Sequence, residues 1–151
     1  MLIYIIISMS FGIEGGYNIP AVNFNDLKSG AALTIFVNRH YRIADVTFSI
    51  GTAFYSGDNT GYSLNSYGLR CGFSKNNWKF SPVIEFGADY VNRKINSAKE
   101  SGYAFNYIIG FMINFHSNKL RIYPKFYYEG ITDFKIQAGF IGAKLGIGYE
   151  I

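Results

Sequence analysis

The sequence has few of the residues that cross-link or kink a chain. It contains one cysteine, Cys71, so neither an intramolecular disulfide nor a cysteine-based zinc cluster can hold the fold together. Only 3 prolines occur among 151 residues. Beyond residue 13, charged residues and glycines interrupt every apolar run before it reaches the ~20 residues that a membrane-spanning helix requires. These absences exclude a disulfide scaffold and a helical membrane protein.

Concentrated positive charge is also absent. The net charge is +4, but the lysines and arginines are scattered along the chain rather than gathered into a stripe. A nucleic-acid partner is therefore not expected, since such partners select a clustered basic surface. What is abundant is apolar and aromatic: 49% of the residues are hydrophobic, with 13 Tyr, 14 Phe and 17 Gly. This mixture favours strands and tight turns, so the composition predicts an all-β protein of one domain.

Apolar residues recur at every second position in eight segments, which predicts eight strands. By residue number the segments are 11–19, 31–37, 46–54, 67–73, 78–90, 103–115, 120–128 and 134–151. Several reach the ~9–11 residues that a tilted strand needs to cross a bilayer, whereas strands of soluble domains typically have ~5–6. The first strand is expected to end at Pro20, and a local bulge is expected at Pro82 and at Pro124, because proline removes a ladder donor.

The connections between these segments alternate in length. Short polar turns at 38–42, 74–77 and 116–119 alternate with mostly longer links around 20–30, 55–66, 92–101 and 129–133. Short turns at one end and long loops at the other are typical of an up-and-down outer-membrane barrel, with the short turns in the periplasm. An even number of strands returns both termini to the periplasmic end. The prediction is an eight-stranded antiparallel up-and-down transmembrane β-barrel.

The residues that alternate with the apolar ones indicate which face points inward. They are rich in glycine and carry few charges, which suits the narrow interior of an eight-stranded barrel better than a water-exposed exterior. Eight of them are charged, four acidic and four basic, and are expected to pair in the lumen: Glu14, Arg70, Glu85, Asp89, Arg121, Lys125, Lys144 and Glu150. Cys71 is expected on the lipid face as a small apolar residue.

Aromatic residues tend to fall near the ends of the apolar faces, as in the girdles at the two water–lipid boundaries of membrane barrels. They are Tyr17, Phe54, Tyr67, Phe73, Trp78, Tyr90, Tyr103, Phe115 and Tyr149. Alternation is equally compatible with a soluble lipocalin-like carrier of apolar ligands, which would turn Phe105, Tyr107, Ile109 and Phe111 into a cavity. Whether Ile109 or Asn106 faces outward separates these two interpretations.

The opening strand GIEGGYNIP, the alternating segments and the closing LGIGYEI together resemble the small outer-membrane β-barrels of Gram-negative bacteria, of the OmpA transmembrane-domain and OmpX type. The resemblance covers residues 11–151. It implies an outer-membrane location and a C-terminal signal for the barrel-assembly machinery, here Leu145, Ile147, Tyr149 and Ile151. Most members end in Phe, and Ile151 departs from that pattern.

The first ten residues, MLIYIIISMS, form a nearly continuous apolar run that finishes in small residues. They resemble the end of a secretory signal peptide, although the usual basic region is missing. We expect residues 1–10 to be a truncated signal peptide or the start of the first strand, and residues 11–151 to form the barrel domain.

The sequence offers little evidence for catalysis or metal binding. His40 and His116 lie in short polar turns without the spacing of a metal site and are expected to be solvated. His116 and Ser117 bear a faint similarity to the pair in outer-membrane lipid A deacylases, but are adjacent where those enzymes separate the two by one residue. We therefore expect a non-enzymatic barrel without cofactor, its lumen plugged by side chains. Outer-membrane lipids, lipopolysaccharide and surface ligands of the loops are its expected partners. A soluble carrier and a lipid-modifying enzyme remain the alternatives.

Overall fold

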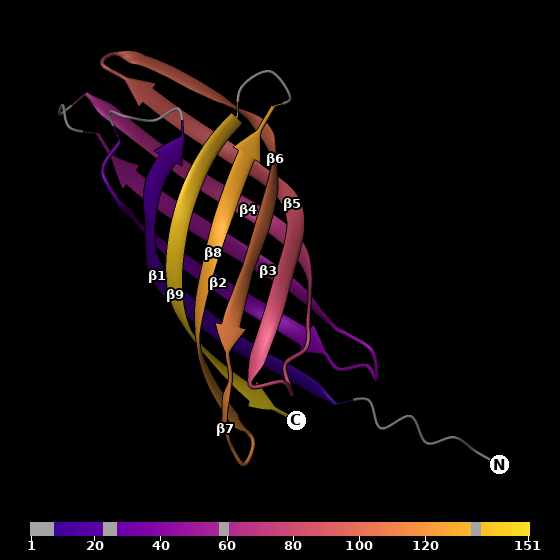
Figure 1. Cartoon of the computed structure of the whole chain (residues 1–151). Coiled ribbons are helices and arrows are strands. Elements are labelled where there is room, and N and C mark those ends of the chain that lie inside the picture. The colour runs from indigo at the N-terminus through magenta and orange to yellow at the C-terminus, as the bar shows by residue number, and fades with distance from the viewer. Residues whose placement is uncertain (1–7, 23–26, 58–60, 134–136) are drawn as a thin grey trace.

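A computed structural model describes residues 8–22, 27–57, 61–133 and 137–151 (Figure 1). Residues 1–7, which hold most of the expected signal segment, lie outside the described residues. The strands are β1 (Met9–Val22), β2 (Gly30–Arg39), β3 (Asp45–Ser56), β4 (Tyr62–Ser74), β5 (Phe80–Ile95), β6 (Ala98–Ile113), β7 (Phe115–Ser117), β8 (Leu120–Thr132) and β9 (Gln137–Glu150). None of the described residues forms a helix long and apolar enough to cross a membrane.

The strands close into a barrel. Consecutive strands pair antiparallel from β1 to β6 and from β7 to β9, β1 pairs with β9, and β6 pairs with β8 to complete the ring. The short β7 prolongs β6, because both keep the same register on β8, with Met112 opposite Lys125 and Phe115 opposite Ile122. The architecture is thus an eight-stranded antiparallel barrel with β7 as a three-residue extra strand, and the predicted fold class is confirmed.

The start of β1 and the end of β9 lie at the same end of the barrel, together with the turns at 40–44, 75–79 and 118–119 (Figure 1). We call this the terminal end and the opposite one the distal end. The backbone N–H of Ile151 donates to Met9 O at 2.9 Å, so the last residue is tied to the start of β1. Strand closure therefore explains why the alternation continues to the end of the printed sequence.

The links at the distal end are shorter than predicted. The polar stretch around 92–101 is not a long loop: β5 and β6 continue through it and are joined at residues 96–97, where Asn96 takes a φ of 54°. Likewise β8 continues to Thr132, through most of the predicted link at 129–133. Backbone ladder bonds do not require apolar side chains, so a hairpin can extend beyond the region where the alternation of polarity marks it.

The expected bulges at Pro82 and Pro124 are wrong, and the register shift lies instead between Pro20 and Val22 on the β1–β9 ladder. Pro82 lies beyond the last β4–β5 pair, Phe73 with Ile84, so it has a partner strand on one side only. Pro124 faces the interruption between β6 and β7, where the ladder already lacks a pair. The first strand passes through its shift and ends at Val22 rather than at Pro20.

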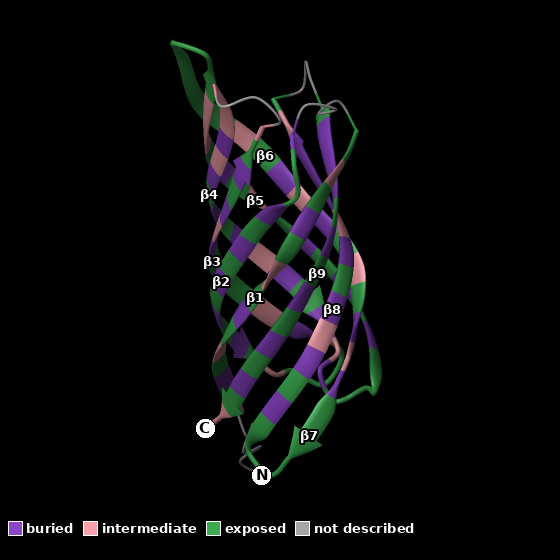
Figure 2. Ribbon diagram, turned by 90° about the vertical axis from the view of Figure 1, so that its left-hand side faces the viewer, coloured by how far each residue is buried: buried purple, intermediate pink, exposed green. Residues whose placement is uncertain are grey.

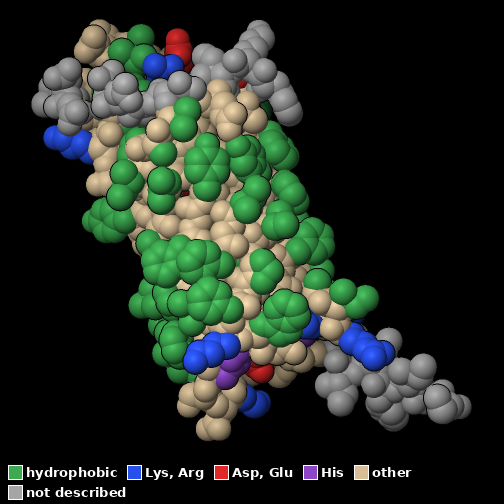
Figure 3. Space-filling model, viewed as in Figure 1, with side chains coloured by type: hydrophobic (Ala, Val, Ile, Leu, Met, Phe, Trp, Pro, Cys, Tyr) green, Lys and Arg blue, Asp and Glu red, His purple; other side chains and the backbone are tan. Residues whose placement is uncertain are grey.

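Exposure alternates along the strands, and the apolar set faces outward (Figure 2). Ile109 is 54% exposed whereas Asn106 is completely buried. Phe105, Ile109 and Phe111, which a lipocalin-like carrier would turn inward, therefore lie on the outside, and the carrier interpretation is wrong. Hydrophobic side chains cover the barrel wall, while the visible charged ones gather toward the two ends (Figure 3).

The glycine-rich inner face makes room for large rings. Tyr123 and Tyr127 on β8 point into the barrel and are almost fully buried. A Cβ at Gly146 on the neighbouring β9 would overlap the Tyr123 ring, and one at Gly142 would overlap the Tyr127 ring. Two glycines four residues apart therefore let two tyrosines fill the lumen.

Candidate functional site: the barrel interior

Charged side chains from non-adjacent strands meet inside the barrel. Seven of the eight expected lumen charges are buried there, namely Glu14, Arg70, Glu85, Asp89, Arg121, Lys125 and Lys144. The eighth, Glu150, lies at the terminal rim with its side chain 34% exposed, and its Oε1 atom is 4.0 Å from His40 Nε2. The buried set is organised around two cations, Lys125 and Arg70.

The Lys125 cluster joins β1, β5 and β8. Lys125 Nζ lies 2.7 Å from Glu14 Oε2 and 2.8 Å from Glu85 Oε1. The Tyr123 hydroxyl donates to Glu14 at 2.8 Å. Lys144 lies at the edge of the cluster: its Nζ is 3.9 Å from Glu14 Oε2 and donates to Thr34 Oγ1 at 3.0 Å. Two carboxylates facing one ammonium, with further donors, meet the condition under which buried charges are tolerated.

The Arg70 cluster lies toward the distal end and joins β1, β4, β5, β6 and β8. Arg70 Nη2 is 2.9 Å from Glu129 Oε1 and 3.3 Å from Asp89 Oδ2. Asn106 donates to both carboxylates, at 2.6 Å to Glu129 and 3.2 Å to Asp89. Asn18 adds a third amide donor to Glu129, at 2.9 Å. Two of these bonds, from Arg70 and from Asn18 to Glu129, cross the lumen between strands that share no ladder.

Glu129 was missed by the sequence analysis, which assigned residues 129–133 to a link. Its side chain is 2% exposed and is the closest carboxylate to Arg70. The signal was present, because Tyr123, Lys125, Tyr127 and Glu129 keep the spacing of two that defines the inner face of β8. Extending that alternation by one step would have found it.

Arg121 is buried without an ionic partner among the described residues. Its guanidinium carbon stacks 4.4 Å from the ring centroid of Tyr123 and 6.0 Å from that of Phe36. The Nε and Nη1 atoms find no hydrogen-bond acceptor in the described part of the chain. A cavity of about 20 Å³ lies beside it. The expectation that Arg121 pairs with an acid is therefore wrong, and cation–π contacts replace that pairing.

The distal third of the interior is apolar rather than charged. Leu27, Ala32, Ala53, Tyr55, Leu64, Ile131, Ala138 and Phe140 form one buried cluster there, which we call the distal apolar cluster. The rings of Tyr55 and Phe140 stack with centroids 4.7 Å apart. Asn18 donates to the Tyr55 hydroxyl at 2.7 Å and so links this cluster to the Arg70 cluster. This apolar layer was not predicted from the sequence.

The terminal rim carries the two histidines. His40 is not simply solvated: its Nδ1 lies 3.2 Å from Asp45 Oδ1, and its side chain is only 19% exposed. The backbone N–H of Asn76 donates to the other Asp45 oxygen. His116 and Ser117 are exposed on β7. Within the described residues, no group of three or more His, Cys, Asp or Glu side chains is placed to hold a metal ion.

The residues of the expected assembly signal lie on the outer face of β9 and, for Ile151, directly after its end. Leu145, Ile147 and Tyr149 are 44–55% exposed, and Ile151 is 74% exposed. Tyr149 packs against Phe11 of β1 with ring centroids 5.9 Å apart. These four residues therefore form one outward apolar stripe, which we call the C-terminal stripe, along the strand that closes the barrel.

An eight-stranded antiparallel barrel with an apolar exterior and a charged interior is the architecture of the small outer-membrane β-barrels, and the chain has this fold. Solved structures agree. The N-terminal β-barrel domain of OprF from Pseudomonas aeruginosa matches with a TM-score of 0.60 at 16% identity, over 94% of this chain and 97% of that one. Ail, the attachment invasion locus protein of Yersinia pestis, matches with a TM-score of 0.60 at 16% identity, over 96% and 97%. Neisserial surface protein A matches with a TM-score of 0.52 at 9% identity, again over 96% and 97%.

The sequence matches no protein-family model, and no curated protein matches it. The likeness therefore lies in the fold, and the expected resemblance to the OmpA and OmpX type is confirmed at that level. The similarity spans nearly the whole chain in each case.

Proposed function

We propose that this chain is an outer-membrane β-barrel of a Gram-negative cell envelope, with both termini in the periplasm and the distal end outside. The observation that carries the proposal is the outward face of the barrel. Ile35, Ile50, Leu69 and Leu145, from four different strands, are each 54–63% exposed. Exposing these side chains to water would be costly, whereas in hydrocarbon they need no further partner.

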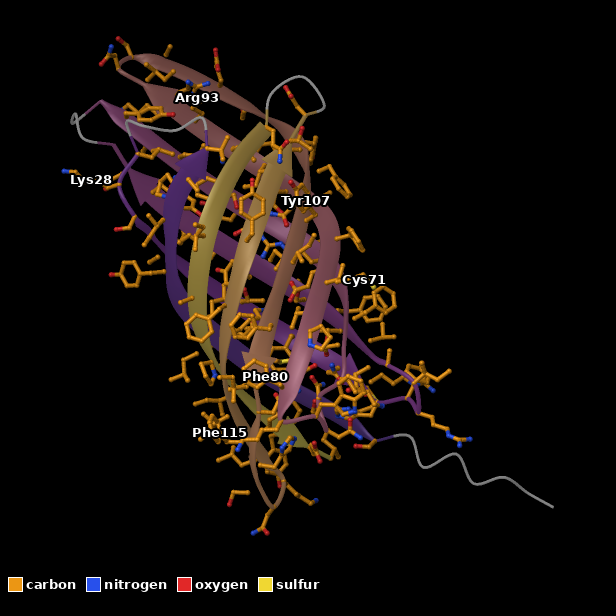
Figure 4. The ribbon with its side chains drawn as sticks, viewed as in Figure 1. Lys28, Cys71, Phe80, Arg93, Tyr107 and Phe115 are labelled. Carbon is orange, nitrogen blue, oxygen red and sulfur yellow. The ribbon has the colours of Figure 1, made fainter. Side chains whose placement is uncertain are left out.

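The outer wall also suits lipid chains in detail. A hollow of about 660 Å³ lies between β2, β3, β4 and β5, lined among others by Val37, Phe48, Leu69, Cys71 and Phe86. Cys71 lies on this wall in Figure 4 and contributes a small apolar side chain. Acyl chains of the surrounding lipids, including lipopolysaccharide, are the occupants that this surface favours.

We propose further that the lumen is closed and its charge network structural. The Lys125 and Arg70 clusters cross the barrel at successive levels, and the distal apolar cluster lies above them. The cavity of about 20 Å³ beside Arg121 has room for about one water molecule. A steady ion path would have to break several buried ion pairs, which makes a pore unfavourable.

The role that fits a closed barrel is structural or surface-interactive, without catalysis. Basic residues at the distal end, among them Lys28, Arg93, Lys94 and Lys99, offer contacts to anionic surfaces. In one crystal structure Ail is in complex with the heparin analogue sucrose octasulfate. For the present chain we infer lipopolysaccharide or surface ligands of the same acidic kind. The C-terminal stripe is inferred to be read by the barrel-assembly machinery during insertion.

Four measurements test the proposal. The folded barrel should migrate faster than the heat-denatured chain on a gel in mild detergent, because closed barrels resist unfolding in it. A purified chain that stays monomeric in plain buffer would contradict the membrane location. In planar bilayers the protein should conduct negligibly, and a large steady current would contradict the closed lumen. A protease added to intact cells should cut the distal hairpins and leave an epitope at the C-terminus untouched.

A further inference from the structure

A cavity of about 270 Å³ opens at the distal end, above the charged part of the lumen. Its walls come from β4, β5, β6, β8 and β9, and its lining reaches from residues buried inside the barrel to Tyr103, which is 81% exposed. Leu64, Ile131, Ala138 and Phe140 of the distal apolar cluster form part of its lining. The volume is near the lower end of the ~300–1,000 Å³ typical of small-molecule sites. We call it the mouth pocket.

The lining of the mouth pocket is apolar where it meets the distal apolar cluster and charged near its opening. Val91 and Ala104 pack against the distal apolar cluster, while Arg93, Glu100 and Asp133 lie in the upper lining. An apolar pocket with a few polar groups at its opening is the general form of a binding site for an amphiphile. The apolar part of such a ligand would replace water against the floor, and its polar head would stay at the mouth.

Arg93 indicates the charge of that head. Its guanidinium carbon lies 5.6 Å from the ring centroid of Tyr62, and its Nε is buried without a hydrogen-bond acceptor in the described part of the chain. Although Glu100 is opposite Arg93 in the β5–β6 register, no ion pair joins the two. A buried donor without an acceptor is costly, and an anionic acceptor would relieve that cost. Arg93 lies at the distal end in Figure 4.

We propose that the mouth pocket binds a single-chain amphiphile with an acidic head, of the medium-chain fatty acid class. The chain lies against Leu64, Ile131 and Phe140, and the carboxylate accepts from Arg93. This inference rests on the proposed function in one respect: if the distal end lies outside the cell, the ligand reaches the pocket from outside. The pocket itself is a property of the barrel.

The test uses the full chain in lipid nanodiscs, titrated with decanoate. Methyl NMR signals of Leu64 and Ile131 report on the pocket, and those of Leu69 and Ile35 on the lipid face report partition into the bilayer. The expected result is a saturable shift of the two pocket methyls, distinct from any gradual drift at the lipid face. Pocket methyls that only follow the lipid-face methyls would overturn the proposal.

Gly102→Phe is the blocking variant. Gly102 lines the pocket, and a Cβ built there meets no heavy atom within 4 Å, so a side chain can fill the space without disturbing the strand. Gly15→Phe is the matched control, because Gly15 also has nothing within 4 Å and lies among the lipid-facing residues of β1. Saturable binding should disappear in the first variant and persist in the second. Equal binding by both would count against the pocket.

Arg93→Gln tests the acidic head. Decanoate affinity should fall by about tenfold or more, the scale of a lost charge-assisted hydrogen bond, while decanol binding stays unchanged. In the unmodified chain, decanoate should bind more tightly than decanol, and decyltrimethylammonium least tightly. Tightest binding of the ammonium would mean that Glu100 and Asp133 dominate, and would refute the acidic ligand. Nanodisc insertion without saturable binding overturns the pocket and leaves the proposed membrane location intact.

Discussion

Lys125 Nζ lies 2.7 Å from Glu14 Oε2 and so connects β8 to β1 across the lumen, although β9 separates these strands in the sheet. The same ammonium is 2.8 Å from Glu85 Oε1 on β5. A ladder bond can join only neighbouring strands, whereas the ion pairs of this one cation link β8 to both β1 and β5. The relationship makes Lys125 the residue whose removal tests the interior most directly.

Lys125→Met should lower the free energy of unfolding by roughly 3–5 kcal/mol, because it leaves Glu14 and Glu85 buried without their shared cation. Urea unfolding of the protein in lipid vesicles measures the change. Lys99→Met is the control, since Lys99 lies exposed on the β5–β6 hairpin. Equal stability of the two variants would show that the Lys125 cluster contributes nothing.

Arg70→Gln should destabilise the barrel more than Arg121→Gln does. Arg70 contacts two buried carboxylates, whereas Arg121 has only ring contacts and makes no ion pair within the described chain. Losing a buried ionic partner costs several kcal/mol, while a cation–π contact is worth about 0.5–2. Unfolding curves of both variants decide the order, and a larger loss for Arg121→Gln would contradict the assignment of partners.

Gly146→Ala should cost about 1–3 kcal/mol through overpacking, because the new Cβ would overlap the Tyr123 ring. Gly15→Ala provides a comparison with the same chemical change, since nothing lies within 4 Å of a Cβ there. Thermal unfolding on gels in mild detergent ranks the two. If both variants melt alike, the glycine does not serve to accommodate the ring.

Leu69→Lys should destabilise the inserted protein by roughly 2–4 kcal/mol, the cost of a cation on the lipid face near mid-depth. Leu69 is 63% exposed and pairs with Ile50 in the middle of the β3–β4 ladder. Leu120→Lys, beside the turn at the terminal end, should cost only about 0–1 kcal/mol because the ammonium reaches the interface. A similar cost at both positions would argue against a bilayer around this wall.

On the proposal that the barrel-assembly machinery reads the C-terminal stripe, Ile151→Phe should increase the rate of insertion, because it places at this outward position the residue that the resemblance leads us to expect. Ile151 is 74% exposed, so the larger ring requires no repacking. Insertion into proteoliposomes that contain the machinery measures the rate. An unchanged rate, with Ile151→Asp equally fast, would show that the stripe is not read.

Much of the inner face was predictable because it depends on a local rule. In β4, β5 and β8 the side chains alternate between faces, so the inward positions of Arg70, Asp89 and Lys125 follow from spacing alone. Glu129 follows the same alternation and was missed only because the strand was predicted to end at residue 128. The end of β5 and the start of β6 were predicted wrongly for a related reason. In a polar hairpin both faces carry polar residues, so the alternation of apolar and polar residues that marks a strand is lost.

The sequence by itself determined the strand number, the lipid-facing set and the inward orientation of most charges, because alternation is a property of each strand separately. Only the closed barrel decided which buried charged side chains pair with one another. Glu14 contacts Lys125, which lies 111 residues away in the sequence. Arg121 instead stacks on the rings of Tyr123 and Phe36. The apolar layer at the mouth arises in the same way, from strand ends that come together only when β6 pairs with β8 and β1 with β9. Partnership across a lumen depends on strand stagger and curvature, which no single segment encodes.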